Sequence, residues 1–142
     1  MKNDIRTLLA GGSALACIVA APALAQDTIT ICITQNNVGV DSYQTTYEQA
    51  FKEAAAGMDN VETIVLDAGG DVARQIAQIQ DLIQQQVDAI IIWPTNGQAV
   101  VPAVRQAKQA GIPVVITNSN IAEEGFEFIA SFSGPDNITQ GA

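Results

Sequence analysis

The chain has 142 residues, with 15 acidic and 6 basic side chains, no histidine and a formal charge of −9 at pH 7. Its length is that of one domain. Such an acidic surface would repel nucleic acid and anionic membranes. A chain without histidine also has no histidine-based acid–base catalysis and no histidine metal ligand.

Residues 1–25 have the pattern of a secretory signal peptide. Basic residues precede a short apolar stretch at residues 8–24, and a small-residue A-x-A pattern ends at Ala25. The apolar stretch is short for a bilayer span. We therefore predict cleavage after Ala25 and a periplasmic location for residues 26–142.

Two alternatives stay open for this segment: a retained anchor, and a lipoprotein that carries its lipid on Cys17. Cleavage after Ala25 would leave Cys32 as the only cysteine, within an apolar stretch. A cysteine in that setting is expected to be a small core residue without a disulfide partner.

Residues 28–34 alternate isoleucine with threonine and cysteine, which predicts a β-strand. A polar loop at residues 35–40 follows, and Asp41 or Ser42 is expected to cap a helix. The expected buried face of this helix consists of Tyr43, Tyr47, Ala50, Phe51, Ala54 and Met58.

Residues 61–66 form a second predicted strand, and Asp71 is the expected N-cap of a second helix. The glutamines of this helix, among them Gln75 and Gln78, are expected to face solvent. Its expected buried stripe consists of Val72, Ile76, Ile79 and Ile83.

Residues 87–120 are predicted to form one strand–helix–strand unit. The apolar runs at residues 88–92 and 113–117 lack polar alternation, which is typical of parallel strands buried on both faces. The helix between them is expected to begin near Pro102 after a separate turn, and Gly111 to follow it at positive φ. Both strands then end at the same sheet edge, where open α/β sheets bind ligands.

Residues 126–132 are a fifth predicted strand after an acidic surface loop, and Asp136 or Asn137 is expected to cap a further helix. Because that helix has barely begun at Ala142, we expect a fragment that lacks a downstream lobe. The alternating elements predict an α/β fold, namely a doubly wound parallel sheet of strand order 2-1-3-4-5 in three α/β/α layers.

Four sequence blocks resemble one family when their order and spacing are taken together. They are ARQIAQIQDLI at residues 73–83, VDAIIIWPTNGQAV at 87–100, QAGIPVVITNS at 109–119 and GPDN at 134–137. With the predicted export signal, they resemble the N-terminal lobe of type I periplasmic sugar-binding proteins, the ribose-binding-protein-like group that serves ABC transporters. The similarity covers residues 28–142.

The resemblance implies a ligand held between two lobes by loops at the carboxyl edges of the strands. In the first loop, Asn36 and Asn37 stand where the family has an asparagine. Ser42 and Tyr43 take the place of its aromatic pair, so one aromatic residue is kept. The loop is also longer than in ribose binders.

The exits of two later strands add further candidates. The family pattern x-P-x-D/N appears as WPTN, which includes Trp93 and Asn96. Asn118 and Ser119 stand where ribose binders have an aspartate–arginine pair. This departure puts ribose in doubt, while the Asn118 amide can donate to and accept from neutral hydroxyls.

The implied function is capture of a small neutral sugar or sugar alcohol and its delivery to an ABC permease in the inner membrane. A chemoreceptor is a further candidate partner, and no cofactor or nucleic acid is implied. Simpler roles stay open for the same residues, namely packing for the aromatic residues and turn or loop formation for the asparagines and serines.

Two other classes of protein share the predicted fold. A flavodoxin-like enzyme domain is disfavoured because the sequence has no G-x-S-x-G, G-x-G-x-x-G or P-loop motif, although Asp67 and Asp71 could form a receiver-type metal site. The effector lobe of a LacI-type regulator would need a helix-turn-helix before residue 28, where the signal peptide is predicted.

Overall fold

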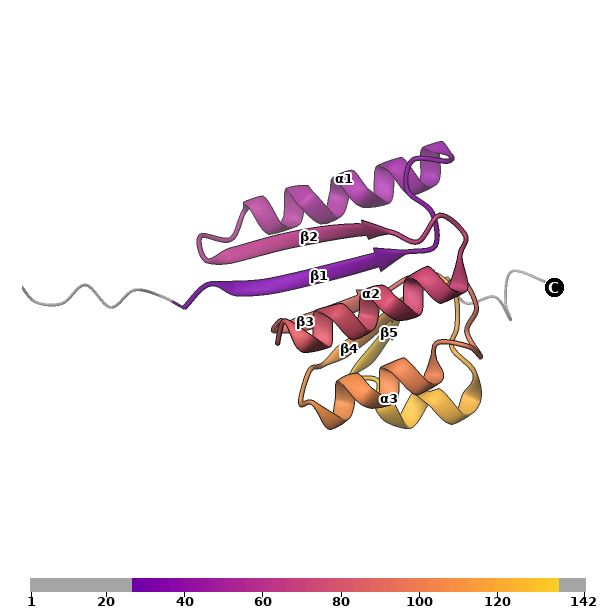
Figure 1. The fold of residues 1–142 in the computed structure, drawn as a ribbon. Helices are drawn as coiled ribbons and strands as arrows, with labels where there is room; N and C mark the ends of the chain where they lie inside the picture. Colours follow the sequence, from indigo (N-terminus) through magenta and orange to yellow (C-terminus); the bar gives the residue numbers. More distant parts are fainter. Residues whose placement is uncertain (1–26, 136–142) are drawn as a thin grey trace, which may run out of the picture.

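A computed structural model describes residues 27–135 of the chain. Its centre is a five-stranded sheet in which all neighbouring strands are parallel, in the order β2-β1-β3-β4-β5. All strands therefore end at the same edge, toward which the arrowheads of β1 and β2 point in Figure 1. The predicted doubly wound order is confirmed. The strands are β1 (Ile29–Gln35), β2 (Val61–Asp67), β3 (Ala89–Ile92), β4 (Val114–Thr117) and β5 (Ser131–Ser133).

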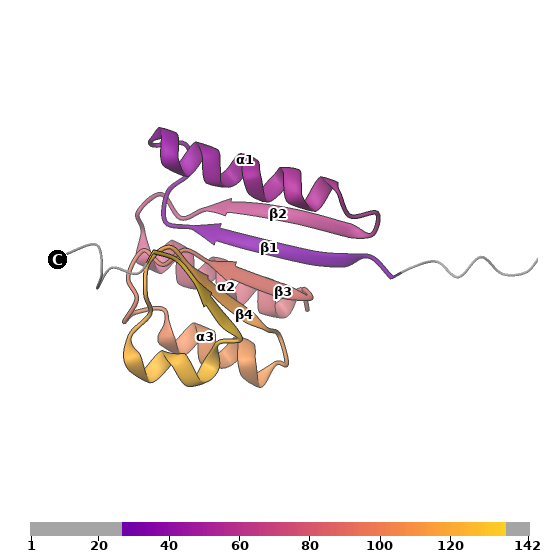
Figure 2. The same ribbon diagram turned by 180° about the vertical axis from the view of Figure 1, so that it is seen from behind.

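Helices cover both faces of the sheet. α1 (Ser42–Ala56) lies along β1 and β2 on one face (Figure 1). α2 (Val72–Gln84) and α3 (Val101–Gln109) lie together on the other face (Figure 2). The predicted three-layer α/β/α arrangement is therefore confirmed.

The main hydrophobic core lies between the sheet and the pair α2 and α3. Side chains of a strand alternate between the two faces, so every second strand residue points into this core. Burial of one isoleucine or leucine side chain contributes about 1.5–3 kcal/mol. Burial also raises the pKa of the Cys32 thiol, and this cysteine is the core residue that the sequence predicts. Fully buried members include Cys32, Ile79, Ile90, Val104 and Ile116.

Short-range chemistry sets where the helices begin and end. Asp41 Oδ1 accepts from Gln44 N at 2.8 Å at the start of α1, and Asp71 Oδ1 accepts from Arg74 N at 3.1 Å at the start of α2. These side-chain oxygens satisfy N–H groups that have no partner within the helix. A separate turn precedes α3, and Gly111 follows it with φ of +80°. Each of these features is predicted by the sequence.

The buried face of α1 differs from the predicted one. Tyr47 and Phe51 are half-buried as expected, but Tyr43 and Met58 are exposed and Gln44 is buried. The first turn of α1 reaches the edge of the sheet and not its face. Tyr43 therefore meets the residues that follow β4, and the stripe predicted from helical spacing is only partly correct.

The fifth strand is shorter than predicted. The sequence predicts a strand over residues 126–132, but a 3₁₀ helix, η1 (Glu123–Phe128), occupies part of this stretch and β5 has only three residues. The Arg105 guanidinium lies 4.8 Å from the centre of the Phe128 ring, and Lys108 Nζ donates to a carbonyl of η1. These contacts with α3 override the local alternation of apolar residues.

Three expectations lie outside the described residues. They are the signal peptide at residues 1–25, lipidation of Cys17, and the helix capped by Asp136 or Asn137. Within residues 27–135, no helix is both long enough and apolar enough to span a bilayer.

Gly97 gives a testable prediction about the fold. A Cβ at this position would lie 2.4 Å from the Asn120 carbonyl oxygen, and the Gly97 carbonyl accepts from Ala122 N at 3.1 Å. The turn before α3 therefore packs backbone to backbone against the segment that follows β4. We expect Gly97→Ala to lower the free energy of unfolding of the full-length protein by about 1–3 kcal/mol, measured by urea denaturation.

Gly57→Ala is the matched control for this prediction. The nearest atom to its added Cβ would lie 3.5 Å away, which is an ordinary contact. It should change the free energy of unfolding by less than about 1 kcal/mol. Equal effects of the two substitutions would contradict the close contact at Gly97.

Candidate ligand-binding site

The strand register brings one row of residues together at the carboxyl edge of the sheet. Gln35 pairs with Asp67, and Thr117 pairs with Ser133. Trp93 follows β3, and its N–H donates to the end of β1 at 2.9 Å, which places it between Gln35 and Thr117. On each strand, the residue just before this row points toward α2 and α3. Because side chains alternate between the two faces, the row itself lies on the α1 side of the sheet. We call these five residues the carboxyl row.

Three aromatic rings meet over the carboxyl row. Tyr43 and Tyr47, one turn apart on α1, pack edge-on against Trp93 with ring centroids 5.7 and 5.4 Å away. Such edge-to-face pairs contribute about 0.5–1.5 kcal/mol beyond their buried area. Trp93 is 4% exposed, whereas Tyr43 is 56% exposed. Of the two candidate aromatic residues, Tyr43 therefore offers a ring to a molecule at the edge, and Trp93 supports it from below.

Two phenol hydroxyls tie the start of α1 to the end of β4. Tyr47 OH donates to Thr117 Oγ1 at 2.8 Å, and Tyr43 OH donates to Asn118 Oδ1 at 2.9 Å. The structure thus brings three sequence-predicted candidates, Tyr43, Trp93 and Asn118, into one contact network.

The backbone of Asn118 is held in an unusual conformation. Its φ is +61°, in the left-handed region that asparagine tolerates better than most residues. Its N–H donates to Ser133 O at 2.9 Å, and the next N–H, that of Ser119, donates to Thr117 O at 2.7 Å. The Asn118 side chain therefore projects from a fixed position at the edge.

The loop after β1 is fastened to the turn after β2. The Asn36 carbonyl accepts from Gly70 N at 2.7 Å, and Asn36 Oδ1 accepts from Asn37 N at 2.8 Å. Asp67 Oδ1 accepts from two N–H groups, Val38 N at 3.1 Å and Gly69 N at 2.8 Å. Asn36 thus uses its side-chain oxygen to shape the loop, which is the simpler role that the sequence left open for it.

The two aspartates considered for a metal site serve the backbone. Asp67 holds the loop after β1, and Asp71 caps α2. In the part of the chain from residue 27 to 135, no group of three or more acidic or cysteine side chains is placed to hold a metal ion.

The sequence-based expectation that the glutamines of α2 face solvent is wrong for Gln75. Its side chain is 0% exposed, its Nε2 donates to the Trp93 carbonyl at 2.9 Å, and its Oε1 accepts from Thr95 N at 2.7 Å. Gln78, nearly one turn later on the same side of α2, is half-buried, accepts from Thr34 Oγ1 at 2.7 Å and donates to the Asp67 carbonyl at 2.8 Å. Gln75, Ile79 and Leu82 share one buried face of α2. The sequence pattern assigned Gln75 to the solvent face only because its side chain is polar.

The other candidates divide by what their side chains do. Asn96 Oδ1 accepts from the N–H groups of Gln98 and Ala99 at 3.0 Å each and so shapes the turn before α3. Among residues 27–135, the side chains of Ser42 and Ser119 form no hydrogen bond, and Ser42 is exposed as the first residue of α1. Within the described residues, the hydroxyls of the two serines are available to another molecule, whereas the side-chain oxygen of Asn96 is used within the turn before α3.

Sequence reasoning missed Gln35, the member of the carboxyl row between Asp67 and Trp93. It is 0% exposed, and within the described residues neither its nitrogen nor its oxygen has a hydrogen-bond partner. The buried Oε1 of Gln44 on α1 has none either. A buried polar group without a partner costs about 1–3 kcal/mol, so this edge is polar at some expense of stability. Polar residues at the end of an apolar strand are the signal that could have found it.

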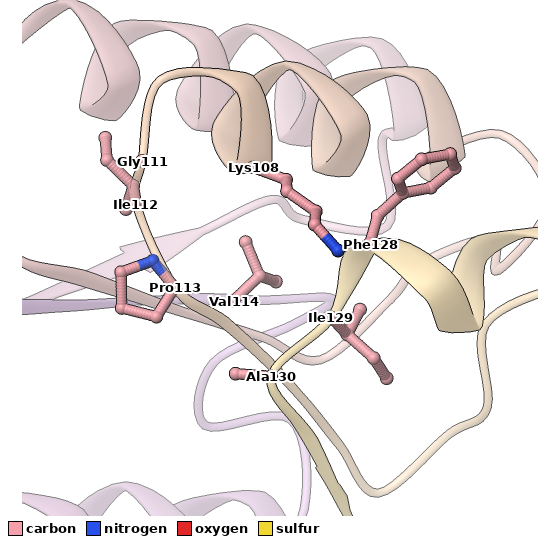
Figure 3. A pocket seen from close by; sticks show the side chains of 8 residues that line it. All are labelled: Lys108, Gly111, Ile112, Pro113, Val114, Phe128, Ile129 and Ala130. Carbon is pink, nitrogen blue, oxygen red and sulfur yellow. The ribbon is translucent and has the colours of Figure 1, made fainter.

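A separate cavity of about 250 Å³ lies at the opposite edge of the sheet, beside the starts of β4 and β5 (Figure 3). Its walls are mostly apolar, including Pro113, Ile129 and Ala130, and the amine of Lys108 bonds to a carbonyl of η1. Small polar ligands need several converging polar groups, which this lining lacks. We therefore place the candidate site at the carboxyl edge, where Tyr43 is exposed to solvent.

The fold agrees with a family match. The family described as periplasmic binding protein domain matches residues 31–142. The chain belongs to this family, and the resemblance to type I periplasmic sugar-binding proteins is confirmed.

Individual relatives show how much of the chain is shared. The ribose import binding protein RbsB of Escherichia coli is 36% identical over 134 residues, which cover 94% of this chain and 43% of that protein. The xylitol-binding protein of Mycolicibacterium smegmatis is 32% identical over 110 residues, which cover 78% of this chain and 27% of that protein.

A solved structure gives the same result in three dimensions. An ABC transporter solute-binding protein from Bacillus halodurans, with bound myo-inositol, matches with a TM-score of 0.72 at 32% identity, over 79% of this chain and 38% of that chain. The chain thus spans less than half the length of each of these relatives.

Gln75 gives the testable prediction of this site. Gln75→Met would leave Trp93 O and Thr95 N without partners, and each such buried group costs about 1–3 kcal/mol. We expect the free energy of unfolding of the full-length protein to fall by about 2–4 kcal/mol, measured in urea. Gln84→Met in the same helix is the control, because Gln84 is exposed, and it should shift the value by less than about 0.5 kcal/mol. A mild effect of Gln75→Met would argue against the role of the carboxamide as the support of the β3 exit.

Proposed function

We propose that residues 26–142 form the N-terminal lobe of a two-lobed substrate-binding protein of an ABC transporter. It captures a small neutral sugar or sugar alcohol in the periplasm and delivers it to a permease in the inner membrane. The observation that carries this proposal is the contact between Tyr43 and Asn118, where an exposed aromatic ring lies beside an uncharged amide.

The side chains at the edge favour a neutral ligand. Among residues 27–135, Asp41, which precedes Ser42, and Asp67, which belongs to the carboxyl row, already accept from backbone N–H groups. Amides and hydroxyls remain, and they match ligand hydroxyls, which both donate and accept. The apolar C–H face of a sugar or polyol packs on an aromatic ring, here that of Tyr43.

The ligands named for the relatives support the same class. They are ribose for the Escherichia coli protein, xylitol for the Mycolicibacterium smegmatis protein and myo-inositol for the Bacillus halodurans structure. Asn118 and Ser119 replace the charged pair expected in ribose binders, which counts against ribose itself, while their amide and hydroxyl groups suit other neutral hydroxyl compounds.

The proposed mechanism is capture by closure. A single sheet edge contacts a ligand from one side, and a second lobe covers the other side as a hinge closes. Closure excludes water, and an amide or hydroxyl left unpaired inside would cost about 1–3 kcal/mol. The closed site therefore selects ligands whose hydroxyls match its donors and acceptors.

We propose binding without catalysis. The Cys32 thiol is buried in the core, where its pKa is raised, so it is a poor nucleophile. Asp67 and Asp71 are engaged in loop and cap hydrogen bonds.

The proposed export gives one prediction. We expect protein recovered from the periplasm to begin at Gln26, because the A-x-A pattern ends at Ala25. Mass spectrometry of the N-terminal peptide measures this directly. Ala25→Leu is the control, since a large residue at the cleavage site should leave the precursor intact. A lipid-modified Cys17 at the N-terminus would show that the lipoprotein alternative is correct.

The proposed ligand class gives a second prediction. Calorimetry on the full-length protein with xylitol, myo-inositol, D-ribose and D-xylose should show binding of at least one of them. Asn118→Gly should weaken the tightest of these about 10- to 100-fold, which corresponds to about 1–3 kcal/mol for hydroxyls left unpaired. Glycine is the suitable replacement because Asn118 has positive φ.

Asn120→Gly is the matched control for Asn118→Gly. It makes the same change two residues along the chain, at an exposed side chain, and should leave the affinity within about twofold. Unchanged affinity of Asn118→Gly would contradict the assigned site, and a wild-type protein that binds none of the four would contradict the ligand class.

A further inference from the structure

The hydrogen bond between Tyr43 and Asn118 does more than hold two candidate residues together. Tyr43 OH donates to Asn118 Oδ1 at 2.9 Å, so the amide oxygen has a partner before any ligand arrives. Within residues 27–135 the amide nitrogen of Asn118 makes no hydrogen bond, and the residue is half-buried. The amide oxygen keeps a second lone pair, and the group without any partner among these residues is the NH₂, which only donates.

The surroundings hold the backbone of Asn118 in one arrangement. Its backbone N–H bonds to Ser133 O at 2.9 Å, and a Cβ on Gly134 would lie 3.1 Å from Asn118 N, so the chain behind it is tightly packed. Tyr43 is itself held by its edge contact with Trp93. With the backbone of Asn118 held and the Tyr43 ring packed on Trp93, the hydrogen bond from the phenol hydroxyl is the contact that sets which way the carboxamide faces.

We infer that Tyr43 is a positioning residue that turns the Asn118 amide so that it donates to an acceptor oxygen of the ligand. This inference rests on the proposed function and specifies it. A freely rotating amide could offer either its oxygen or its nitrogen to a hydroxyl. A fixed amide binds only ligands that place an acceptor, a hydroxyl or ether oxygen, at this point of the site.

The hydroxyl of Tyr47 provides a matched control. It also joins α1 to the end of β4, through Thr117 Oγ1 at 2.8 Å. Thr117 is buried, so this second bond lies below the edge and does not orient a group that a ligand could reach. Tyr47→Phe should therefore lower stability as Tyr43→Phe does, without the same effect on affinity.

The test is a double-mutant cycle on the full-length protein, with whichever of xylitol, myo-inositol, D-ribose or D-xylose binds the wild type most tightly. Tyr43→Phe should weaken binding about 3- to 10-fold, and Tyr47→Phe less than about twofold. In an Asn118→Gly background, Tyr43→Phe should have no further effect, because the amide that it orients is gone. Additive effects would overturn the inference, since the Tyr43 hydroxyl, whose ring is kept in Tyr43→Phe, would then act on the ligand independently of Asn118.

Asn118→Asp tests the direction of the hydrogen bond. Aspartate keeps the shape, tolerates the left-handed backbone and can still accept from Tyr43, but it has no N–H donors. It should lose at least as much affinity as Asn118→Gly. An aspartate variant that binds as tightly as the wild type would show that Asn118 accepts from the ligand, which contradicts the inference.

The orientation can also be measured without a ligand. In NMR spectra, Tyr43→Phe should shift the side-chain NH₂ signals of Asn118, and Tyr47→Phe should leave them in place. Unchanged signals in Tyr43→Phe would overturn the positioning role. A clear shift in a protein that binds none of the four compounds would leave this inference intact and contradict the proposed ligand class alone.

Discussion

The buried carboxamide of Gln75 is the interaction on which the carboxyl edge depends. It binds the carbonyl of Trp93 and the N–H of Thr95, two backbone groups that would otherwise end β3 without partners. Trp93 is the surface against which Tyr43 and Tyr47 pack, and those tyrosines in turn reach the end of β4. A residue of α2, on the opposite face of the sheet, thereby supports a site on the α1 side. Because buried amides are strong only when both ends are satisfied, the complete pairing of Gln75 makes this support rigid.

Much of the fold could be predicted from the sequence because local chemistry and tertiary structure agree there. The β-branched runs became β3 and β4, Asp41 and Asp71 became caps, and Gly111 took its positive φ. The prediction was wrong where tertiary contacts override local pattern. Residues 126–132 alternate like a strand, but Phe128 packs beneath Arg105 of α3, and the first part of this stretch lies in a 3₁₀ helix. A pattern that sorts residues into apolar and polar cannot detect a buried glutamine, so the position of Gln75 was missed for a related reason.

The place of the candidate site was predictable, and its internal arrangement was not. Parallel strands end at one edge, so the residues after β1, β3 and β4 had to be neighbours. Which of them present groups to solvent depends on where α1 sits across that edge. α1 covers Trp93 and leaves Tyr43 exposed, and the loops use the side-chain oxygens of Asn36 and Asn96 for their own turns. These outcomes follow from contacts between segments distant in the sequence, about which short-range spacing has no information.

A site built on one sheet edge gains affinity mainly by being rigid before the ligand arrives. Ordering a side chain on binding costs about 0.5–1.5 kcal/mol, and the fixed rings and fixed Asn118 amide have met that cost during folding. Within the described residues the buried carboxamide of Gln35 in the same row has no hydrogen-bond partner, which lowers stability at this edge. In the proposed two-lobed protein, a rigid edge on this side would leave closure of the second lobe as the main motion of binding. The free energy of closure would then exclude water and would not be needed to order side chains. Under that proposal, the network from Gln75 through Trp93 to Tyr43 and Asn118 is the fixed half against which the second lobe would close.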